Sequence, residues 1–165
     1  LKESILPDLN ILTVSSLLKE KSQDESILGK DIKNKMDNGD LIEDTIVISV
    51  LKEKVNTLSN EQILIDGFPR SSIQADSLLE IFENKDLSII NFDVDDDQLL
   101  QRIKKRSMEE SRADDSFFEK RLQIYKKSHL EILNSLKKNY SVTDIPANDE
   151  ISSVTTKIID KLGLN

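Results

Sequence analysis

The chain of 165 residues is 37% hydrophobic, and its 23 basic residues are outnumbered by 31 acidic ones, which gives a net charge of −8. This composition predicts one soluble domain with no membrane span, and the negative charge argues against wholesale binding to nucleic acid or to an anionic membrane. The absence of Cys excludes a Cys-based zinc site, and the single His excludes an all-His site. A chain without Cys suits the reducing cytoplasm.

The first part of the chain predicts a short strand followed by helices. The apolar run at residues 9–14 is the strand, and Ser15 or Ser16 is placed to cap the helix that follows it. A second helix at residues 27–36 is expected to end at Gly39, which suits a left-handed cap. A third helix at residues 42–55 has one apolar face, formed by Ile46, Val47, Val50, Leu51 and Val55.

The rest of the chain alternates strands with helices. The apolar runs at residues 62–66 and 87–94 predict buried strands, and a last strand is expected at residues 140–145. This alternation predicts an α/β domain with a parallel sheet covered on both faces. Helices are predicted at residues 73–84, 96–106, 116–138 and 150–162.

The sequence DGFPR, at residues 66–70, places an Arg directly after the strand at residues 62–66. All but five of the basic residues are Lys, so each Arg is a candidate for two-pronged binding of phosphate, which Lys cannot provide. Arg70 ends a strand-to-loop transition, where parallel α/β sheets bind ligands. For any one Arg, a surface ion pair with a nearby acid is an alternative of similar weight. The five are Arg70, Arg102, Arg106, Arg112 and Arg121.

The run ILIDGFPRSSIQ resembles the signature of the nucleoside monophosphate kinases, and most closely that of adenylate kinase. The resemblance continues in order through LGKDIKNKMDNGDLIEDTIV, DVDDDQLLQRIKKR, SRADD and EKRLQIY, and so covers nearly the whole chain. It implies a P-loop kinase-like parallel sheet flanked by helices, in one domain at residues 1–165. Within that domain it implies a mobile monophosphate-binding segment at residues 14–43 and a short lid at residues 107–111, with no zinc.

The resemblance also implies an activity: reversible, Mg²⁺-dependent phosphoryl transfer from ATP to a nucleoside monophosphate, with AMP as the expected acceptor. On the acceptor side, Asp66 matches the acid that holds water ligands of the magnesium ion, Arg70 the clamp on the monophosphate, and Gln74 the residue that reads the base edge. A monomer is expected. The other acceptor positions are Val14, Lys19, Met36, Ile42, Gly67, Arg112 and Arg121.

On the donor side, the resemblance implies that Arg102 stacks over the adenine of ATP and that Arg106 contacts its phosphates. Ala147 and Asn148 match a loop that contacts the adenine through its backbone. Arg112 and Arg121 match the pair that engages the phosphates between donor and acceptor. The implied catalytic set is therefore Arg70, Arg106, Arg112 and Arg121.

The sequence departs from the family pattern at its beginning. Family members start with a strand and a Gly-rich loop that ends in Gly-Lys and wraps the ATP phosphates. The four Gly residues here form no such loop, so we expect the first, central strand and the phosphate loop to be absent from these 165 residues, most simply by truncation. The strands at residues 62–66 and 88–93 would then have unpaired edges. The 165 residues without a phosphate loop are expected to be inactive.

Two further departures concern phosphate-binding residues. Val14, Ser15 and Ser16 stand where the family usually has Thr-Gly-Asp, and Lys19 stands where it has an Arg. Losing a hydroxyl and a bidentate fork predicts weaker or altered acceptor binding. The spacing from the paired acids to Arg121 is also slightly shorter than usual, which bears on the direction of that side chain.

Three hypotheses remain open from the sequence. The first is an adenylate kinase whose phosphate loop lies outside these residues. The second is a kinase for UMP, CMP or another monophosphate, because the pocket around Val14 and Lys19 is altered. The third is a homologue that binds nucleotides or a partner without catalysis.

Overall fold

The structure is a computed structural model that describes residues 8–38, 40–58, 62–83, 86–110 and 118–164. At residues 103–104, 106–110 and 118–127 only the backbone is described. The chain divides into two compact units, residues 2–86 and residues 87–165, each of which is described by itself. None of the described helices is long and apolar enough to cross a membrane.

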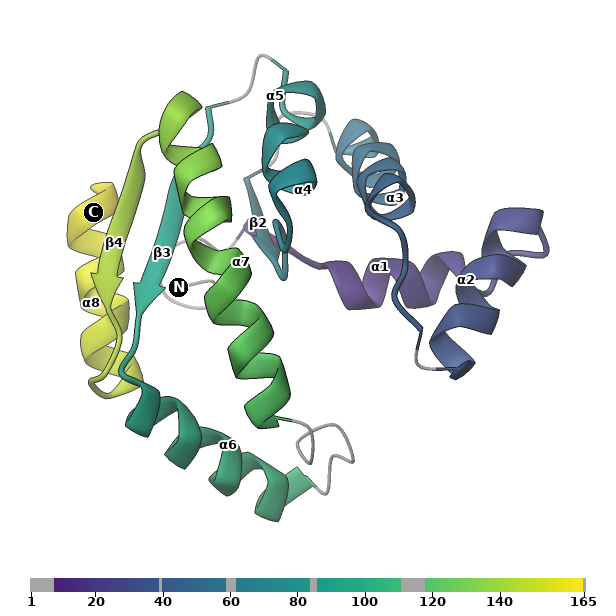
Figure 1. The fold of residues 1–165 in the computed structure, drawn as a ribbon. Helices are drawn as coiled ribbons and strands as arrows, with labels where there is room; N and C mark the ends of the chain where they lie inside the picture. Colours follow the sequence, from purple (N-terminus) through teal and green to yellow (C-terminus); the bar gives the residue numbers. More distant parts are fainter. Residues whose placement is uncertain (1–7, 39, 59–61, 84–85, 111–117, 165) are drawn as a thin grey trace. The chain divides into compact units, whose positions relative to one another are not determined.

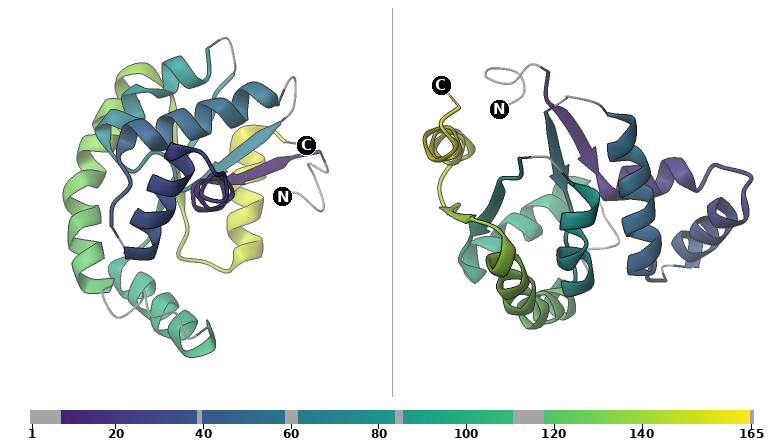
Figure 2. Two further views of the ribbon diagram at one scale, coloured as in Figure 1. Left: turned by 90° about the vertical axis from the view of Figure 1, so that its right-hand side faces the viewer. Right: turned by 90° about the horizontal axis from the view of Figure 1, so that it is seen from above.

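The unit at residues 2–86 is built on a pair of parallel strands. Strand β1 (Asn10–Thr13) pairs with β2 (Ile63–Asp66) in a register that places Thr13 beside Asp66 at the carboxyl ends of both strands, and Figure 2 shows the two strands side by side. Helix α1 continues directly from β1 and packs against α2 and α3 (Figure 1). The helices are α1 (Val14–Lys21), α2 (Ile27–Asn38), α3 (Asp44–Thr57), α4 (Ser72–Asp76) and α5 (Leu78–Ile81).

The core of this unit lies where α3 packs on α1, α4 and α5. The apolar face that the sequence predicts for the third helix is confirmed at four of its five positions, while Ile46 is half-buried. Burial of such side chains stabilises the unit by about 1.5–3 kcal/mol each. The buried residues of α3 are Val47, Val50, Leu51 and Val55.

The unit at residues 87–165 is also built on a pair of parallel strands. Strand β3 (Ile89–Asp93) pairs with β4 (Val142–Pro146), and helix α8 (Ile151–Leu162) packs against β4 (Figure 1). Helices α6 (Asp96–Glu110) and α7 (Phe118–Asn139) lie between the two strands in the sequence. Gly163 ends α8 in the left-handed conformation, with φ +63°. The buried apolar residues of this unit are Ile132, Leu136, Ile145, Ala147 and Ile158.

The prediction of an α/β fold with parallel strands is confirmed, but its details change. In the described residues β2 pairs only with β1, and β3 only with β4, so two parallel pairs replace the single sheet that the pattern predicts. The apolar residues of β2 and β3 are half-buried to exposed, with Phe92 49% exposed, so the prediction that both strands are buried is wrong. A strand paired on one edge only has fewer neighbours to cover it.

Helix boundaries also differ from the prediction. Helix α1 begins at Val14 after Thr13, so neither Ser15 nor Ser16 is its cap; the Thr13 hydroxyl instead donates to Ser16 Oγ at 2.6 Å. The single helix expected at residues 73–84 is divided into α4 and α5 at Ser77, whose hydroxyl donates to the Gln74 carbonyl at 2.7 Å. Such back-bonding to the preceding turn often bends a helix. The predicted cap at Gly39 lies outside the described residues.

Candidate functional site

The DGFPR turn follows directly from the carboxyl end of β2. Gly67 has φ +82°, a conformation that side chains with a Cβ rarely adopt, and the Phe68–Pro69 peptide bond is cis. A Cβ at Gly67 would lie 2.8 Å from Arg70 Nη2. Arg70 folds back over the turn because its Nε donates to the Gly67 carbonyl at 2.9 Å. The turn therefore favours glycine for its backbone, and a Cβ at this position would make the end of the Arg70 side chain shift.

The backbone of Arg70 is held by a buried amide. Gln74 is only 5% exposed, and its Oε1 accepts from the Arg70 backbone N–H at 2.7 Å. Its Nε2 donates to Oδ1 of Asp44, the first residue of α3, at 2.7 Å. Each end of the Gln74 amide thus makes one hydrogen bond to protein, and its predicted role in reading the base stays a prediction.

Ser71 completes the same network. It is the N-cap of α4, where its Oγ accepts from the Gln74 backbone N–H at 3.1 Å. The hydroxyl proton is donated to Asp44 Oδ2 at 2.8 Å, so both carboxylate oxygens of Asp44 are bonded. Sequence reasoning missed Asp44, because it lies 27 and 30 positions from its partners and no local pattern links them.

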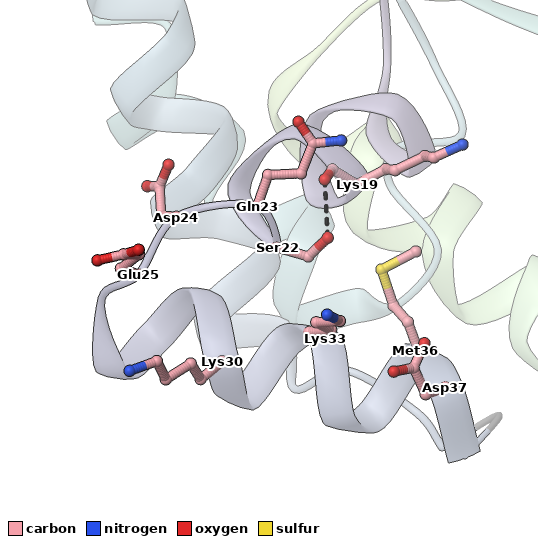
Figure 3. Close-up of a pocket in the computed structure, with 9 residues that line it drawn as sticks. All are labelled: Lys19, Ser22, Gln23, Asp24, Glu25, Lys30, Lys33, Met36 and Asp37. Atoms are coloured by element: carbon pink, nitrogen blue, oxygen red, sulfur yellow. Dashed lines mark hydrogen bonds between the residues drawn. The ribbon is translucent and has the colours of Figure 1, made fainter.

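A pocket of about 490 Å³ lies between α1 and α2 (Figure 3). It brings together two of the predicted acceptor residues, Lys19 from α1 and Met36 from α2, and in Figure 3 the Met36 thioether reaches toward α1. Of the other predicted acceptor residues, Val14 is buried in the core and Ile42 is half-buried outside this lining. The remaining lining residues are Ser22, Gln23, Asp24, Glu25, Lys30, Lys33 and Asp37.

An ion-pair cluster joins α2 to the start of α3 next to this pocket. Lys35 Nζ lies 2.7 Å from Asp31 Oδ2 and 2.6 Å from Glu43 Oε2. Hydrogen bonds to Asp31 and Glu43 raise the pKa of Lys35, and the hydrogen bond from Lys35 lowers the pKa of Glu43. The cluster ties together the two ends of the stretch that contains Met36 and Ile42.

In the unit at residues 87–165, three predicted ATP-side residues come together at the carboxyl ends of β3 and β4. Arg102 Nη2 donates to the Ala147 carbonyl at 2.8 Å and to the Asp149 carbonyl at 3.3 Å. The Asn148 amide forms a reciprocal pair with Asp95: its Nδ2 donates to Asp95 Oδ2, and its Oδ1 accepts from the Asp95 backbone N–H, both at 2.9 Å. The loop after β4 is thus fixed from α6 by an Arg and from the turn before α6 by an Asp.

The remaining predicted arginines are described less fully. Arg106 and Arg121 lie in α6 and α7, where only their backbones are described, and Arg112 lies outside the described residues. Residues 107–110 of the predicted lid form the end of α6, and Ser111 lies outside the description. The roles predicted for these three arginines and the lid remain predictions.

The two arginines with described side chains allow the ion-pair alternative to be judged. Arg70 bonds a backbone carbonyl of its own turn, and Arg102 bonds two carbonyls of the loop after β4. Within the described part of the chain, neither forms an ion pair with a carboxylate. Among the described residues, the alternative of an ordinary surface ion pair therefore finds no support for Arg70 or Arg102.

Asp66 is the predicted magnesium residue. It is exposed at the end of β2, and the described residues contain no group of three or more His, Cys, Asp or Glu placed to hold a metal ion. Mg²⁺ is usually held by one or two carboxylates together with water and substrate phosphates rather than by a cage of protein ligands. An exposed single carboxylate at the carboxyl end of a parallel strand fits that mode of binding.

The parallel α/β fold carries Arg70 directly after the end of a strand, the place where open α/β sheets bind their ligands. Comparison with known proteins identifies the family. The sequence profile of the adenylate kinase family matches residues 3–141. The chain belongs to the adenylate kinase family, whose members are phosphotransferases acting on nucleoside monophosphates.

Individual relatives agree. The chain is 33% identical to an adenylate kinase from Hyphomonas neptunium over 153 residues, which is 89% of this chain and 81% of that protein. It is 27% identical to one from Leptospira biflexa, over 92% of this chain and 84% of that protein. A match to the adenylate kinase of Borrelia duttonii is 37% identical over 102 residues, and spans 60% of this chain and about half, 47%, of that protein.

Proposed function

We propose that the protein catalyses reversible phosphoryl transfer from ATP to AMP, with residues 2–86 binding the acceptor and residues 87–165 binding the adenosine part of the donor. The observation that carries the proposal is the state of Arg70. Its Nε is anchored to Gly67, while the two terminal nitrogens of its guanidinium have no protein partner among the described residues. A fixed fork with open nitrogens is the arrangement that grips a phosphate with two parallel hydrogen bonds.

Phosphoryl transfer needs positioned positive charge rather than a nucleophilic side chain. Arg70 would hold the acceptor phosphate at the end of β2. Asp66, four residues earlier, would hold magnesium through water, and the ion would supply neutralisation of the phosphate charge when bound. Arg106, Arg112 and Arg121 are proposed to contact the phosphates as charge develops between donor and acceptor.

On the donor side, Arg102 and the loop after β4 would receive the adenine of ATP. The backbone bonds between Arg102 and the carbonyls of Ala147 and Asp149 support this role, because they hold the loop against the guanidinium that is proposed to stack on the base. Residues 14–43 and 107–111 would close over the acceptor and donor and exclude water. The protein is proposed to work as a monomer in the cytoplasm.

The acceptor is the part of the proposal to test first. The protein expressed from its whole gene should be assayed with ATP, magnesium and equal concentrations of AMP, UMP or CMP, with ADP formation measured in both directions. We expect turnover with AMP to exceed that with either pyrimidine nucleotide by at least about tenfold, a difference of about 1.4 kcal/mol in the transition state. Faster turnover with UMP or CMP would overturn the assignment of AMP.

A pyrimidine monophosphate is the second candidate, and the altered pocket leaves it open. Lys19 lines the pocket between α1 and α2 at the position where the family pattern has an Arg, and Val14 is buried where that pattern has a hydroxyl. Both changes alter the acceptor side alone. Nucleotide binding without turnover of any of the three monophosphates would instead favour a non-catalytic homologue.

A further inference from the structure

The part-buried hydrogen bonds between Asp44, Ser71 and Gln74 have directions that are set by the chemistry of the groups. A carboxylate can only accept hydrogen bonds, and a backbone N–H can only donate them. Asp44 lies on one side of the Gln74 amide and the Arg70 N–H on the other. The amide therefore has a single orientation that satisfies both neighbours, and Asp44 and the Arg70 N–H set it together.

The Ser71 hydroxyl is directed by the same carboxylate. Because its proton is donated to Asp44, its lone pairs face the Gln74 N–H that it caps. Two chains of hydrogen bonds therefore lead from Asp44 to residues 70–74. One runs through Ser71, the cap of α4, and the other through the Gln74 amide, which holds the Arg70 backbone. Asp44 is the first residue of α3. The network therefore also fixes the turn at residues 66–70 to a helix whose inner face is in the core.

We infer that Asp44 is a positioning residue for acceptor binding: through Ser71 and Gln74 it holds Arg70 where its guanidinium meets the acceptor phosphate. This inference rests on the proposed function. Asp44 would act through Ser71 and Gln74, the residues to which it is hydrogen-bonded. Its loss leaves the Gln74 NH₂ group and the Ser71 hydroxyl without their carboxylate partner, so the amide that accepts from the Arg70 N–H is held from one side only.

The test compares Asp44→Ala and Asp44→Asn with Asp86→Asn, which makes the same change of charge at an exposed position of the same unit. We expect KM for AMP to rise at least about tenfold in Asp44→Ala, the effect of losing hydrogen bonds to a charged group, while KM for ATP stays at the wild-type value. Asp44→Asn should be affected less, and Asp86→Asn not at all. A KM for AMP that is unchanged in both Asp44 variants would overturn the inference.

Hydrogen exchange of the Arg70 amide separates positioning from general damage. We expect the Arg70 amide to exchange faster in Asp44→Asn, and to recover its protection when Gln74→Glu is added. In the double variant the introduced asparagine can donate its NH₂ to the introduced glutamate and accept from Ser71 with its carbonyl, while the glutamate accepts from the Arg70 N–H. Failure of Gln74→Glu to restore protection would contradict the mechanism, and so would equal loss of protection throughout residues 2–86.

The two proposals fail in different ways. If the wild-type protein transfers no phosphoryl group to AMP, the proposed function fails and the role of Asp44 in acceptor binding fails with it. If the wild-type protein is active and the Asp44 variants keep its KM for AMP, only the positioning role is wrong. If Asp44→Ala does not fold, Asp44→Asn and Ser71→Ala each remove one branch of the network and give the same comparison.

Discussion

The two units of the chain use arginine in opposite ways. In residues 2–86, Arg70 is fixed through its backbone and its Nε, and its terminal nitrogens remain open. In residues 87–165, a terminal nitrogen of Arg102 is bonded to two carbonyls of the loop after β4. A guanidinium with open nitrogens suits recognition of a phosphate by charge, whereas one bonded at its edge offers its flat face. The difference supports the proposal that one unit recognises a phosphate and the other a base.

Replacement of Arg70 should have the largest effect, a loss of activity toward AMP. Arg70→Ala removes the fork that is proposed to hold the acceptor phosphate, and we expect kcat/KM for AMP to fall by about 10²–10³, as for other groups that stabilise transition-state charge. Arg70→Lys keeps the charge but not the bidentate geometry, and should recover only part of the loss. Steady-state kinetics at saturating ATP measure both. Full activity of Arg70→Lys would show that charge alone is sufficient.

Replacement of Arg102 should affect the other substrate. Arg102→Ala removes two hydrogen bonds to the loop after β4 together with the face proposed for adenine, and we expect KM for ATP to rise about tenfold, or about 1.4 kcal/mol. KM for AMP should not change. Lys105→Ala, an exposed cation on the same helix, is the control. A rise in KM for AMP as large as that for ATP would argue against separate roles of the two units.

Each unit has one described glycine with positive φ, and the two glycines form a matched pair. A Cβ at Gly67 would meet Arg70 Nη2 at 2.8 Å, whereas one at Gly163 meets nothing within 4 Å. Gly163→Ala should therefore cost only the backbone strain, about 1–2 kcal/mol of unfolding free energy. Gly67→Ala should cost that strain and also displace Arg70, raising KM for AMP. Denaturant unfolding and AMP kinetics distinguish the two, and equal AMP kinetics in both variants would contradict this reading of the turn.

The smallest expected effect concerns how carboxylates respond to salt. The pKa of Glu43 is lowered from its usual 4.5 by the hydrogen bond from Lys35, and that of Asp144 is lowered from 3.8, first by the hydrogen bond from Asn91 and then by Lys137. Each lowered pKa contributes stability that is present above the unfolded-state pKa and is lost as pH falls through the folded-state pKa. Salt screens a charged partner more than a neutral one, so added salt should move the pKa of Glu43 back toward 4.5 more than it moves that of Asp144.

The measurement is an NMR titration of both carboxyl groups at low and high salt. The two acids lie in different units, so each serves as the control for the other. The pKa of Lys35, which is raised above 10.5, gives a second sign to check: its contribution is present below 10.5 and is lost only as pH rises through the higher value in the folded protein. Equal salt shifts for Glu43 and Asp144 would mean that Lys35 is not the main cause at Glu43.

Patterns of short range predicted most of the elements. The apolar face of α3 and the order of strands and helices could be read from spacing, because both depend on neighbours within a few residues. The break between α4 and α5 could not, because it follows from the hydroxyl of Ser77 bonding back to Gln74. The exposure of β2 and β3 also escaped prediction, since it depends on which strands pair across the sheet.

The candidate site shows the same limit. The motifs in the sequence pointed to Arg70, Gln74, Arg102 and the loop at Ala147. In the structure, Arg102 is hydrogen-bonded to Ala147. No motif in the sequence pointed to Asp44, whose partners are distant in the chain. None indicated that the Gln74 amide is bonded at both ends. Contacts that join separate elements through single hydrogen bonds leave no periodic trace in a sequence.

The separate roles of the two units can be tested most directly by amide NMR spectra of the labelled protein with each nucleotide alone. The account predicts that AMP at concentrations near its KM shifts the amide signals of Gly67, Arg70 and Gln74, while ATP shifts those of Ala147 and Asn148. Movement of the same set of signals by both nucleotides, or no effect of AMP on the turn after β2, would contradict the division into an acceptor side and a donor side.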